Sequence, residues 1–385
     1  MSQSAPSTLQ KAARLWGMFA IFVVATAILT NINNSNQTDF ISFWAAAKLA
    51  LGGNFSGIYD LEQHRAIQTA VIHLDGYMPF PYPPPYILAV LPFGLMAYPV
   101  AHAAWVLVTG SAYLAAARRL VPESGWLAVA FPPVIICGII GQNSFLAAAI
   151  MMFALALLRF SPLRAGLVFG LLIFKPHLGI LIPVALIAGR EWRVFAGATL
   201  STVGLIIGSL ILFGWASWTG FFALLPLYGS IAADGLVSWN KMASVYAAAS
   251  LIGVPTVLAW LLHIGIAVAA VAILWRTWAT TKDVGLRGVT LVSATLLISP
   301  YLYVYDQVML LAALALLWQR GIDQRWLMAI YGVSVFSLAG SFMPATIINL
   351  APLVAIIPLL IVTRLSVPTA GRHHQHAPQT GQSYQ

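Results

Sequence analysis

Charged side chains are scarce in this sequence. Asp, Glu, Lys and Arg make up 8% of its 385 residues, against roughly a quarter in a typical soluble domain. A water-soluble globule with so few charges could not cover its surface. Intrinsic disorder is excluded as well, because 60% of the residues are hydrophobic, whereas disordered chains are poor in apolar residues and rich in charge. The composition therefore indicates an all-α integral membrane protein with many helices.

Cysteine is nearly absent, since Cys137 is the single one and lies in an apolar run. A disulfide framework and a thiolate metal site are excluded on that count. The sequence also lacks histidines at metal-binding spacing, a Gly-rich phosphate loop and a G-x-S-x-G elbow. We therefore expect no metal and no cofactor. The net charge of +9 does not indicate a nucleic-acid partner, because the basic residues follow the membrane topology.

Apolar runs then set the number of helices. A helix needs about 20 apolar residues to cross the hydrocarbon core, and the first candidate runs from Leu15 to Asn31. No small-x-small cleavage site follows it, so we interpret it as an uncleaved signal-anchor. The later apolar stretches bring the expected total to about ten to twelve helices. They form one transmembrane domain over 15–365, between a cytoplasmic N-terminus (1–14) and a disordered cytoplasmic tail (366–385).

Two longer polar segments interrupt these runs, at about 32–82 and 214–255. The first contains two helical patterns, Phe40–Leu51 and Leu61–Leu74, with Asp60 as a plausible N-cap of the second. Both patterns are typical of amphipathic helices that lie in the membrane interface, with Phe and Trp facing lipid.

Charge placement predicts the orientation through the positive-inside rule. With the N-terminus inside, most of the 19 basic residues also fall inside. Arg118 and Arg164 can both be inside only if 84–97 and 165–189 dip into the membrane and return. The competing arrangement has both stretches cross, and it places four arginines outside. Either arrangement puts the segments 32–82 and 214–255 outside.

Polar residues at membrane depth are costly and indicate function. Asp39 and Asp306 lie at the outer boundary, where a role as helix caps would also account for them. Lys175 lies in the middle of an apolar stretch, at a Lys-Pro break, and needs a buried partner or an anionic ligand. Gln142 and Asn143 stand where a helix begins outside, and capping or interhelical hydrogen bonds are the alternative there. Together they predict an outer cavity suited to an enzyme that acts on lipid-linked substrates.

Several strings in this order resemble glycosyltransferase family 87. These are bacterial polytopic proteins related to polyprenol-phosphate-mannose-dependent α-mannosyltransferases, with a GT-C type fold. The resemblance runs from about Asp39 to Leu311 and is carried by TDFISFWAAAKLAL, FPYPPPYILAVLPFGLM, GQNSFLAAA, FGLLIFKPHLGILIPVALIAGREWR, WNKMASVYAA and SPYLYVYDQVMLL. The strings are specific for the family in this combination but not for one substrate.

The resemblance implies an inverting transfer in which Asp39 is the general base. It would take the proton from an acceptor hydroxyl that attacks the anomeric carbon of a polyprenyl-phosphate sugar. Lysines that match the family pattern would meet the charge on the leaving phosphate. The residues implied in binding the donor phosphate or sugar are Lys175, Lys241, Gln142, Asn143, Tyr82, Tyr301, Tyr305 and Asp306.

The resemblance also implies the partners and the location. The donor is a polyprenyl-phosphate-linked sugar, the acceptor is a lipid or a glycan, and no nucleic acid takes part. The protein is expected in the bacterial cytoplasmic membrane, multi-pass, with its active site facing the periplasm or the exterior. The chain departs from the family pattern in the string YLYVYDQ (301–307), where some members carry a histidine. This departure leaves the identity of the sugar, mannose or another, and of the acceptor open. A transporter or flippase of a lipid-linked substrate, and a non-catalytic scaffold, are the alternatives.

Overall fold

The computed structural model describes residues 8–34, 38–74, 77–233, 239–342 and 349–365. Within these ranges the chain is helical, and an isolated bridge between Met242 and Tyr303 is the one β-type pairing. The α-helices are α1 (Thr8–Asn34), α2 (Phe40–Leu51), α3 (Leu61–Thr69), α4 (Pro85–Val90), α5 (Tyr98–Leu120), α6 (Gly125–Ala130), α7 (Pro133–Ile140), α8 (Ser144–Leu157), α9 (Pro162–Gly170), α10 (Pro176–Gly179), α11 (Leu181–Ala188), α12 (Trp192–Ala233), α13 (Val245–Leu251), α14 (Thr256–Thr280), α15 (Val284–Ile298), α16 (Leu311–Gln319), α17 (Gln324–Gly340) and α18 (Leu353–Leu365). The predicted tail 366–385 and the first seven residues lie outside the described ranges.

Among the described residues, four helices are long and apolar enough to cross a membrane, namely Ala13–Asn31, Tyr98–Leu120, Trp192–Leu227 and Thr256–Thr280. A fifth span results if the pair Pro122–Ala130 and Pro133–Ile140, bent by 71°, is counted as one. The all-α membrane architecture is therefore confirmed, whereas the expected total of ten to twelve helices is not. The other apolar helices have 10–17 residues, which is short of the about 20 that a full crossing needs.

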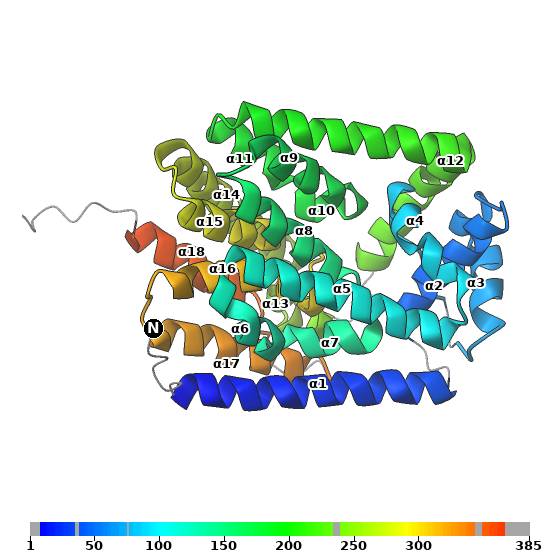
Figure 1. Ribbon diagram of the computed structural model, residues 1–385, viewed down its shortest axis with the longest axis horizontal. Helices are drawn as coiled ribbons and strands as arrows, with labels where there is room; N and C mark the ends of the chain where they lie inside the picture. The colour runs from blue at the N-terminus through cyan, green and yellow to red at the C-terminus, as the bar shows by residue number, and fades with distance from the viewer. Residues whose placement is uncertain (1–7, 35–37, 75–76, 234–238, 343–348, 366–385) are drawn as a thin grey trace, which may run out of the picture.

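The long helices α1, α5 and α12 extend in roughly the same direction, between two ends of the molecule (Figure 1). The helices α2, α3 and α4 gather at one end, here called the α2 end. The opposite end holds the start of α1, the end of α18 and a cavity that Arg119, Arg159 and Arg320 line together; we call it the arginine end. Since these arginines share one cavity, they lie on one side of the membrane. This favours the arrangement in which 84–97 does not cross.

The segment α9–α11 enters and leaves at the arginine end. The start of α9 packs on the start of α12 so closely that a Cβ on Gly166 would overlap the carbonyl oxygen of Val194. A Cβ on Gly197 would likewise overlap the carbonyl oxygen of Leu163. Between the two arms the helix breaks into a 3₁₀ turn, Leu171–Phe174, just before Lys175. Small residues permit this close helix packing, and the broken backbone is tolerated because protein surrounds it.

The first predicted loop helix is a core element, which corrects the expectation of an interfacial helix. Phe40, Phe43 and Trp44 of α2 are 0%, 2% and 5% exposed, so they do not face lipid. The ring of Phe40 stacks on those of His102 and Trp105 from α5, at centroid distances of 5.7 and 5.9 Å. An apolar run that faces protein on every side has the same composition as one that faces lipid, and the sequence did not separate the two.

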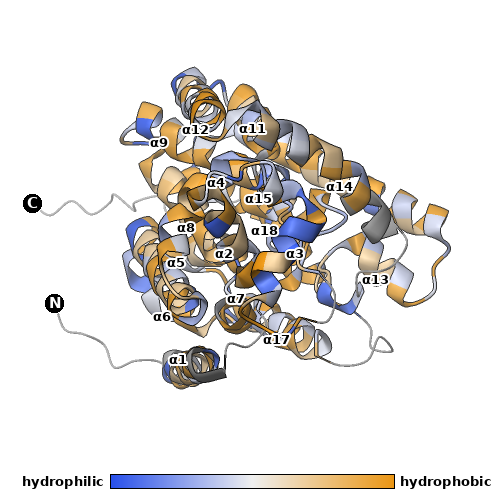
Figure 2. Ribbon diagram, turned by 90° about the vertical axis from the view of Figure 1, so that its right-hand side faces the viewer, coloured by the Kyte–Doolittle hydropathy of each residue, from blue (hydrophilic) through white to orange (hydrophobic). Residues whose placement is uncertain are grey.

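The second predicted loop helix lies on the surface. The helix α3 ends at Thr69 rather than at Leu74, at the α2 end (Figure 2). Glu62, Gln63 and Arg65 are exposed on it, whereas His64 and Gln68 are buried. Asp60 is its N-cap as predicted, since its Oδ1 accepts a hydrogen bond from the Gln63 amide at 2.9 Å. The predicted loop 214–255 is also corrected. The helix α12 continues to Ala233 and is kinked at Gly214, whose φ of 71° is non-helical.

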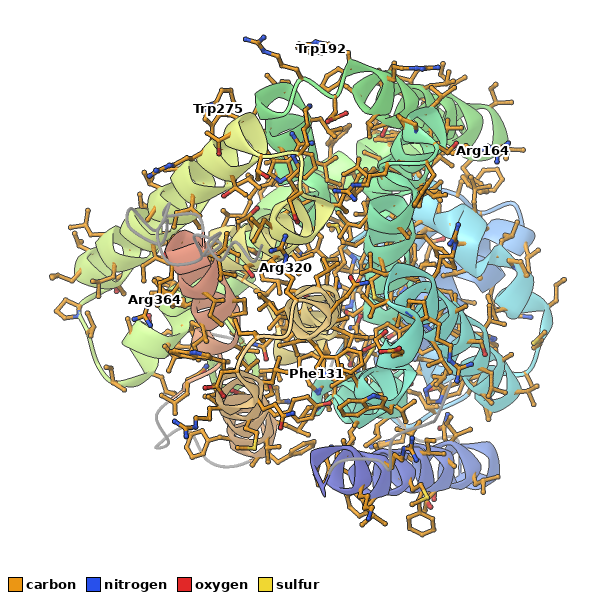
Figure 3. The ribbon with its side chains drawn as sticks, turned by 60° about the vertical axis from the view of Figure 1, so that its left-hand side comes forward. Phe131, Arg164, Trp192, Trp275, Arg320 and Arg364 are labelled. Atoms are coloured by element: carbon orange, nitrogen blue, oxygen red, sulfur yellow. The ribbon has the colours of Figure 1, made fainter. Side chains whose placement is uncertain are left out.

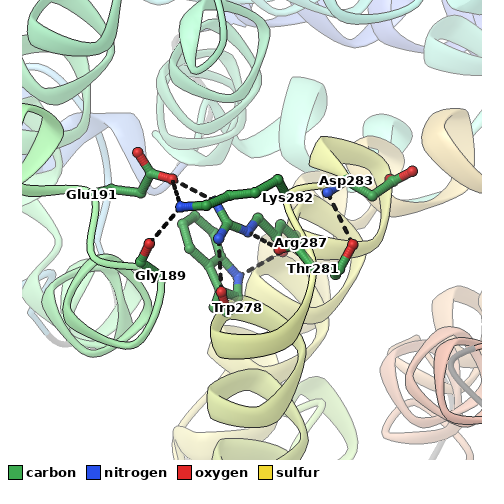
Figure 4. Close-up of polar contacts among 7 residues, drawn as sticks. All are labelled: Gly189, Glu191, Trp278, Thr281, Lys282, Asp283 and Arg287. Atoms are coloured by element: carbon green, nitrogen blue, oxygen red, sulfur yellow. Dashed lines mark hydrogen bonds and ion pairs between the residues drawn. The ribbon is translucent and has the colours of Figure 1, made fainter.

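At the arginine end a buried arginine joins two interhelical turns (Figure 4). Arg287 is 2% exposed, and its Nη1 binds Glu191, before α12, at 2.7 Å. The same guanidinium donates to the carbonyl oxygens of Trp278 at 2.7 Å and Thr281 at 2.6 Å. Lys282 also binds Glu191, at 2.9 Å, but its side chain is 71% exposed. The cluster thereby ties the α11–α12 turn to the α14–α15 turn.

We expect Arg287→Met to lower the free energy of unfolding by about 2 to 4 kcal/mol, because buried carbonyl oxygens lose their donors and Glu191 loses a buried partner. Lys282→Met removes an exposed partner of the same carboxylate and should cost about 0 to 1 kcal/mol. Unfolding of the purified protein in detergent, followed by tryptophan fluorescence, measures both. Equal losses for the two variants would contradict the role assigned to Arg287.

Candidate active site

Asp39 occupies the N-cap position of α2, yet its carboxylate does not cap the helix. Its Oδ2 instead accepts a hydrogen bond from Nε2 of Gln142 at 2.7 Å, across 103 positions of the sequence. The side chain is half-buried. Helix capping therefore does not account for Asp39, and its carboxylate faces the turn between α7 and α8.

The local sequence brings that turn close to Asp39. Thr38, the preceding residue, shares a hydrogen bond of 2.9 Å with the hydroxyl of Tyr98 at the start of α5. Gly141 ends α7 with a φ of 68°, in the left-handed region that favours glycine. A Cβ at Gly141 would come within 2.6 Å of the His102 ring and 2.8 Å of the Phe40 Cβ. Glycine is thus required for the close approach that places Gln142 beside Asp39.

Lys175 has the buried partner that its position predicts. Its Nζ donates to Oδ1 of Asp306 at 2.5 Å, to Oδ1 of Asn143 at 2.9 Å and to Oγ of Ser144 at 3.3 Å. Lys175 and Asp306 are 3% and 2% exposed. Ser144 donates to the same Asp306 oxygen at 2.5 Å. The three ammonium hydrogens of Lys175 are therefore matched by three acceptors, and Asp306 is an ion-pair partner rather than a cap.

Two adjacent residues link the buried ion pair to the half-exposed carboxylate. Gln142 binds Asp39, and Asn143 binds Lys175. The amide N–H of Asn143 also donates to Oε1 of Gln142 at 3.2 Å, which orients the Gln142 side chain. Ser144 was not predicted as a site residue, although it follows these two residues directly and belongs to the same hydrogen-bond network. A serine at the start of a helix is common as a cap, so nothing in the sequence assigned Ser144 to the site.

Two of the predicted tyrosines lie at this network. The Lys175 Nζ is 5.4 Å from the ring centroid of Tyr305. Tyr303, which was not among the predicted site residues, stacks on Tyr305 at a centroid distance of 5.1 Å. Tyr82 is 8% exposed. Its pKa lies well above the ordinary value because of burial first and then of the nearby Asp306 carboxylate.

The third tyrosine lies elsewhere. Tyr301 packs on Trp260 and Tyr246, at ring distances of 6.4 and 6.5 Å. Among the described residues, no hydrogen bond or ring contact joins it to the network around Lys175. Tyr301 therefore belongs to an aromatic cluster with α13 and α14 and not to the group around Asp39.

Lys241 is exposed and lies close enough to Asp39 for its charge to lower the pKa of that carboxyl. Its chain segment is held against the segment that leads to Asp306. The amide of Ala243 donates to the carbonyl oxygen of Leu302 at 2.5 Å. Asn349 donates to the carbonyl oxygen of Met242 at 2.6 Å. The structure thus brings a second lysine to the same site from a distant part of the sequence.

The electrostatics favour a basic Asp39. Burial raises the pKa of its carboxyl above the ordinary value, against the hydrogen bond from Gln142 and the charges of Lys241 and Lys175, which act in the opposite direction. A carboxylate with a raised pKa is a stronger proton acceptor. Within the described ranges, no three His, Cys, Asp or Glu side chains come together as a group that could hold a metal ion.

Comparison with models of protein families matches residues 80–300 to glycosyltransferase family 87. The matched segment includes the predicted site residues from Tyr82 to Lys241, and it leaves Asp39 and Asp306 outside at its two ends. Comparisons with curated proteins and with solved structures found no match. Since the matched segment is more than half of the chain and the chain is a helical membrane protein, the protein belongs to glycosyltransferase family 87 and is a glycosyltransferase.

Proposed function

We propose that the protein is an inverting glycosyltransferase with a GT-C type fold. It moves a sugar, with mannose as the first choice, from a polyprenyl-phosphate donor to a lipid or glycan acceptor. The reaction takes place at the outer face of the bacterial cytoplasmic membrane, which corresponds to the α2 end. The positive-inside rule supports this orientation, because the arginines that share a cavity lie at the opposite end.

The observation that carries the proposal is the hydrogen bonding and partial exposure of the Asp39 carboxylate. Gln142 engages one carboxylate oxygen, Oδ2. No described residue donates a hydrogen bond to the other oxygen, Oδ1, and the side chain is half-buried rather than sealed. An acceptor hydroxyl can therefore hydrogen-bond to Oδ1, and the carboxylate takes its proton as the oxygen attacks the anomeric carbon of the donor. The polyprenyl phosphate leaves from the opposite face, which inverts the configuration.

The two lysines have different roles in this mechanism. Lys241 is exposed beside Asp39, so its ammonium is the one that can contact the departing phosphate. Lys175 donates its hydrogen bonds to Asp306, Asn143 and Ser144, so its role is to position other residues of the site. It holds Asn143, and through that residue Gln142 and the orientation of the base. Fixed positive charge at the position of the leaving group stabilises the transition state.

Transfer of radiolabelled mannose from polyprenyl phosphomannose tests the proposal, with the purified protein in lipid nanodiscs and extracted membrane lipid or glycan as acceptor. We expect label in the acceptor, with the anomeric configuration opposite to that of the donor. Transfer from a polyprenyl-phosphate glucose in place of mannose would correct the sugar. If no polyprenyl-phosphate sugar is consumed, the proposal fails and a transporter of lipid-linked substrates takes its place.

The acid side of the pH profile should report on Asp39. The base acts only when deprotonated, so kcat/KM falls as the pH drops through its pKa. Since burial raises that pKa, the loss should begin at a higher pH than for an ordinary aspartate. Gln142→Leu removes a hydrogen bond that lowers the pKa, so it should move the acid limb to still higher pH.

The matched control for this profile is Gln63→Leu, which removes a glutamine of the same kind from α3, away from the site. Its acid limb should coincide with that of the unmodified protein. A shift of the Gln142→Leu profile to lower pH would contradict the assignment of the limb to Asp39.

A further inference from the structure

The arginine end holds a cavity of about 360 Å³ between the C-terminal ends of α5, α8 and α16 and the start of α15. Arg119, Arg159 and Arg320 line it, each from a different helix end. Among the residues that line it, Asp283 is the one carboxylate. A single arginine at a helix C-terminus is common, because it interacts favourably with the helix dipole. The convergence of three such ends on one cavity is a feature that the dipole does not explain.

The positive charge in this cavity is only partly compensated. Asp283 forms an ion pair with Arg320, and it also caps α15 by accepting a hydrogen bond from the Leu286 amide at 3.0 Å. No ion pair joins Arg119 or Arg159 to a carboxylate in the part of the chain that the structure describes. Both side chains are exposed. The guanidinium groups of Arg119 and Arg159 are therefore available to an anion in the cavity. The Arg320–Asp283 ion pair forms another part of the lining.

The position of the cavity indicates where such an anion comes from. The helix α5 begins at Tyr98, beside Thr38, and ends at Leu120 next to Arg119. Its 23 residues span about 34 Å, comparable with the roughly 30 Å of a hydrocarbon core. The cavity thus lies at the membrane boundary opposite Asp39. Trp192 and Trp275, which are 59% and 48% exposed, lie at the same end (Figure 3), as expected of an interfacial aromatic belt.

Most of the remaining lining is apolar, with Gln319 as the polar exception. Leu120, Leu155, Leu316 and Phe160 belong to this wall, and Phe160 is 80% exposed. A site for a free inorganic ion has no need of an exposed aromatic ring and leucines. A lipid presents a phosphate and acyl chains together, so it matches both parts of the lining. Basic pockets between helices at the cytoplasmic boundary are a known type of site for anionic headgroups.

We infer that this cavity binds the phosphate of an anionic membrane phospholipid. Arg119 and Arg159 donate charge-assisted hydrogen bonds to the phosphate oxygens. Phe160 and Leu155 contact the start of an acyl chain. The bound lipid bridges the ends of α5 and α8 and so stabilises the helix bundle. The inference is independent of the proposed sugar transfer, because the site lies at the other boundary of the membrane.

The test uses the delipidated full-length protein in dodecyl maltoside, with thermal unfolding as the readout. We expect dioleoyl phosphatidylglycerol to raise the Tm in a saturable way, and dioleoyl phosphatidylcholine to have little effect. The double variant R119Q/R159Q should need at least about tenfold more phosphatidylglycerol for the same shift, since it loses charge-assisted hydrogen bonds to the phosphate. The control R276Q/R325Q makes the same change of charge with exposed arginines that do not line the cavity.

Three results would overturn the inference. Equal shifts for R119Q/R159Q and the unmodified protein would place the lipid elsewhere. An equal effect of phosphatidylcholine would show that the anionic headgroup is not recognised. Displacement of phosphatidylglycerol by inorganic phosphate would assign the site to a free ion. If the double variant is not recovered folded, Arg159→Gln alone, with retained phosphatidylglycerol measured by native mass spectrometry, decides the same question.

Discussion

Asp39→Asn should lower kcat for sugar transfer by about two to four orders of magnitude, the usual contribution of a general base. The amide keeps the shape of the carboxylate but cannot take the proton of the acceptor hydroxyl. Because the Asp39 side chain does not cap α2, the substitution removes no helix cap, and the fold should persist. The measurement is transfer of radiolabelled sugar from the polyprenyl-phosphate donor at equal protein concentration, with the Tm in detergent as the check on folding.

Asp60→Asn is the matched control. It makes the same chemical change at an aspartate of the same segment between α1 and α4, one that caps α3 through the Gln63 amide. Asparagine is also a good N-cap, so neither the fold nor kcat should change. Asp39→Asn with undiminished turnover would exclude it as the base. A loss of turnover in both variants to the same extent would point to the segment between α1 and α4 as a whole rather than to one carboxylate.

The features that the sequence predicted well depend on local physical chemistry. The scarcity of charge implied a membrane protein, and the structure has helices long and apolar enough to cross. The N-cap at Asp60 depends on a contact three residues away, and the boundaries of α2 were predicted from its apolar run. Lys175 was expected to need a partner because an unpaired ammonium at that depth is costly, and Asp306 is that partner.

The features that the sequence did not predict depend on contacts between distant segments. The sequence allowed Asp39 to be a helix cap, and only its contact with Gln142, 103 positions away, shows that its carboxylate is not one. The burial of α2 depends on aromatic rings of α5 that no periodicity in α2 reveals. Gly214 interrupts α12 by its backbone conformation, yet apolar residues on both sides allow the helix to continue past it. Ser144 and Tyr303 could be assigned to the site only once the folded structure placed them beside Lys175 and Tyr305.

Lys175→Met should destabilise the protein strongly. It leaves the Asp306 carboxylate, 2% exposed, without its ion-pair partner, and removal of one member of a buried pair costs about 3 to 5 kcal/mol. Asp306→Leu should cost a similar amount, because Lys175 is then unpaired. The double variant K175M/D306L removes both charges and replaces them with apolar groups. It should recover most of the lost stability, since apolar replacements of buried pairs are often neutral or stabilising.

The activity of the double variant separates the two roles of the pair. Unfolding in detergent gives the stabilities, and transfer of radiolabelled sugar gives kcat for the same three variants. We expect the double variant to stay at least about tenfold slower than the unmodified protein, because Asn143 loses its donor at Lys175 and no longer holds Gln142 in place beside the base. Stability and activity that return together would reduce the pair to a structural contact. Unchanged stability of the single variant Lys175→Met would contradict the ion pair itself, because a buried carboxylate that loses its partner carries a desolvation cost.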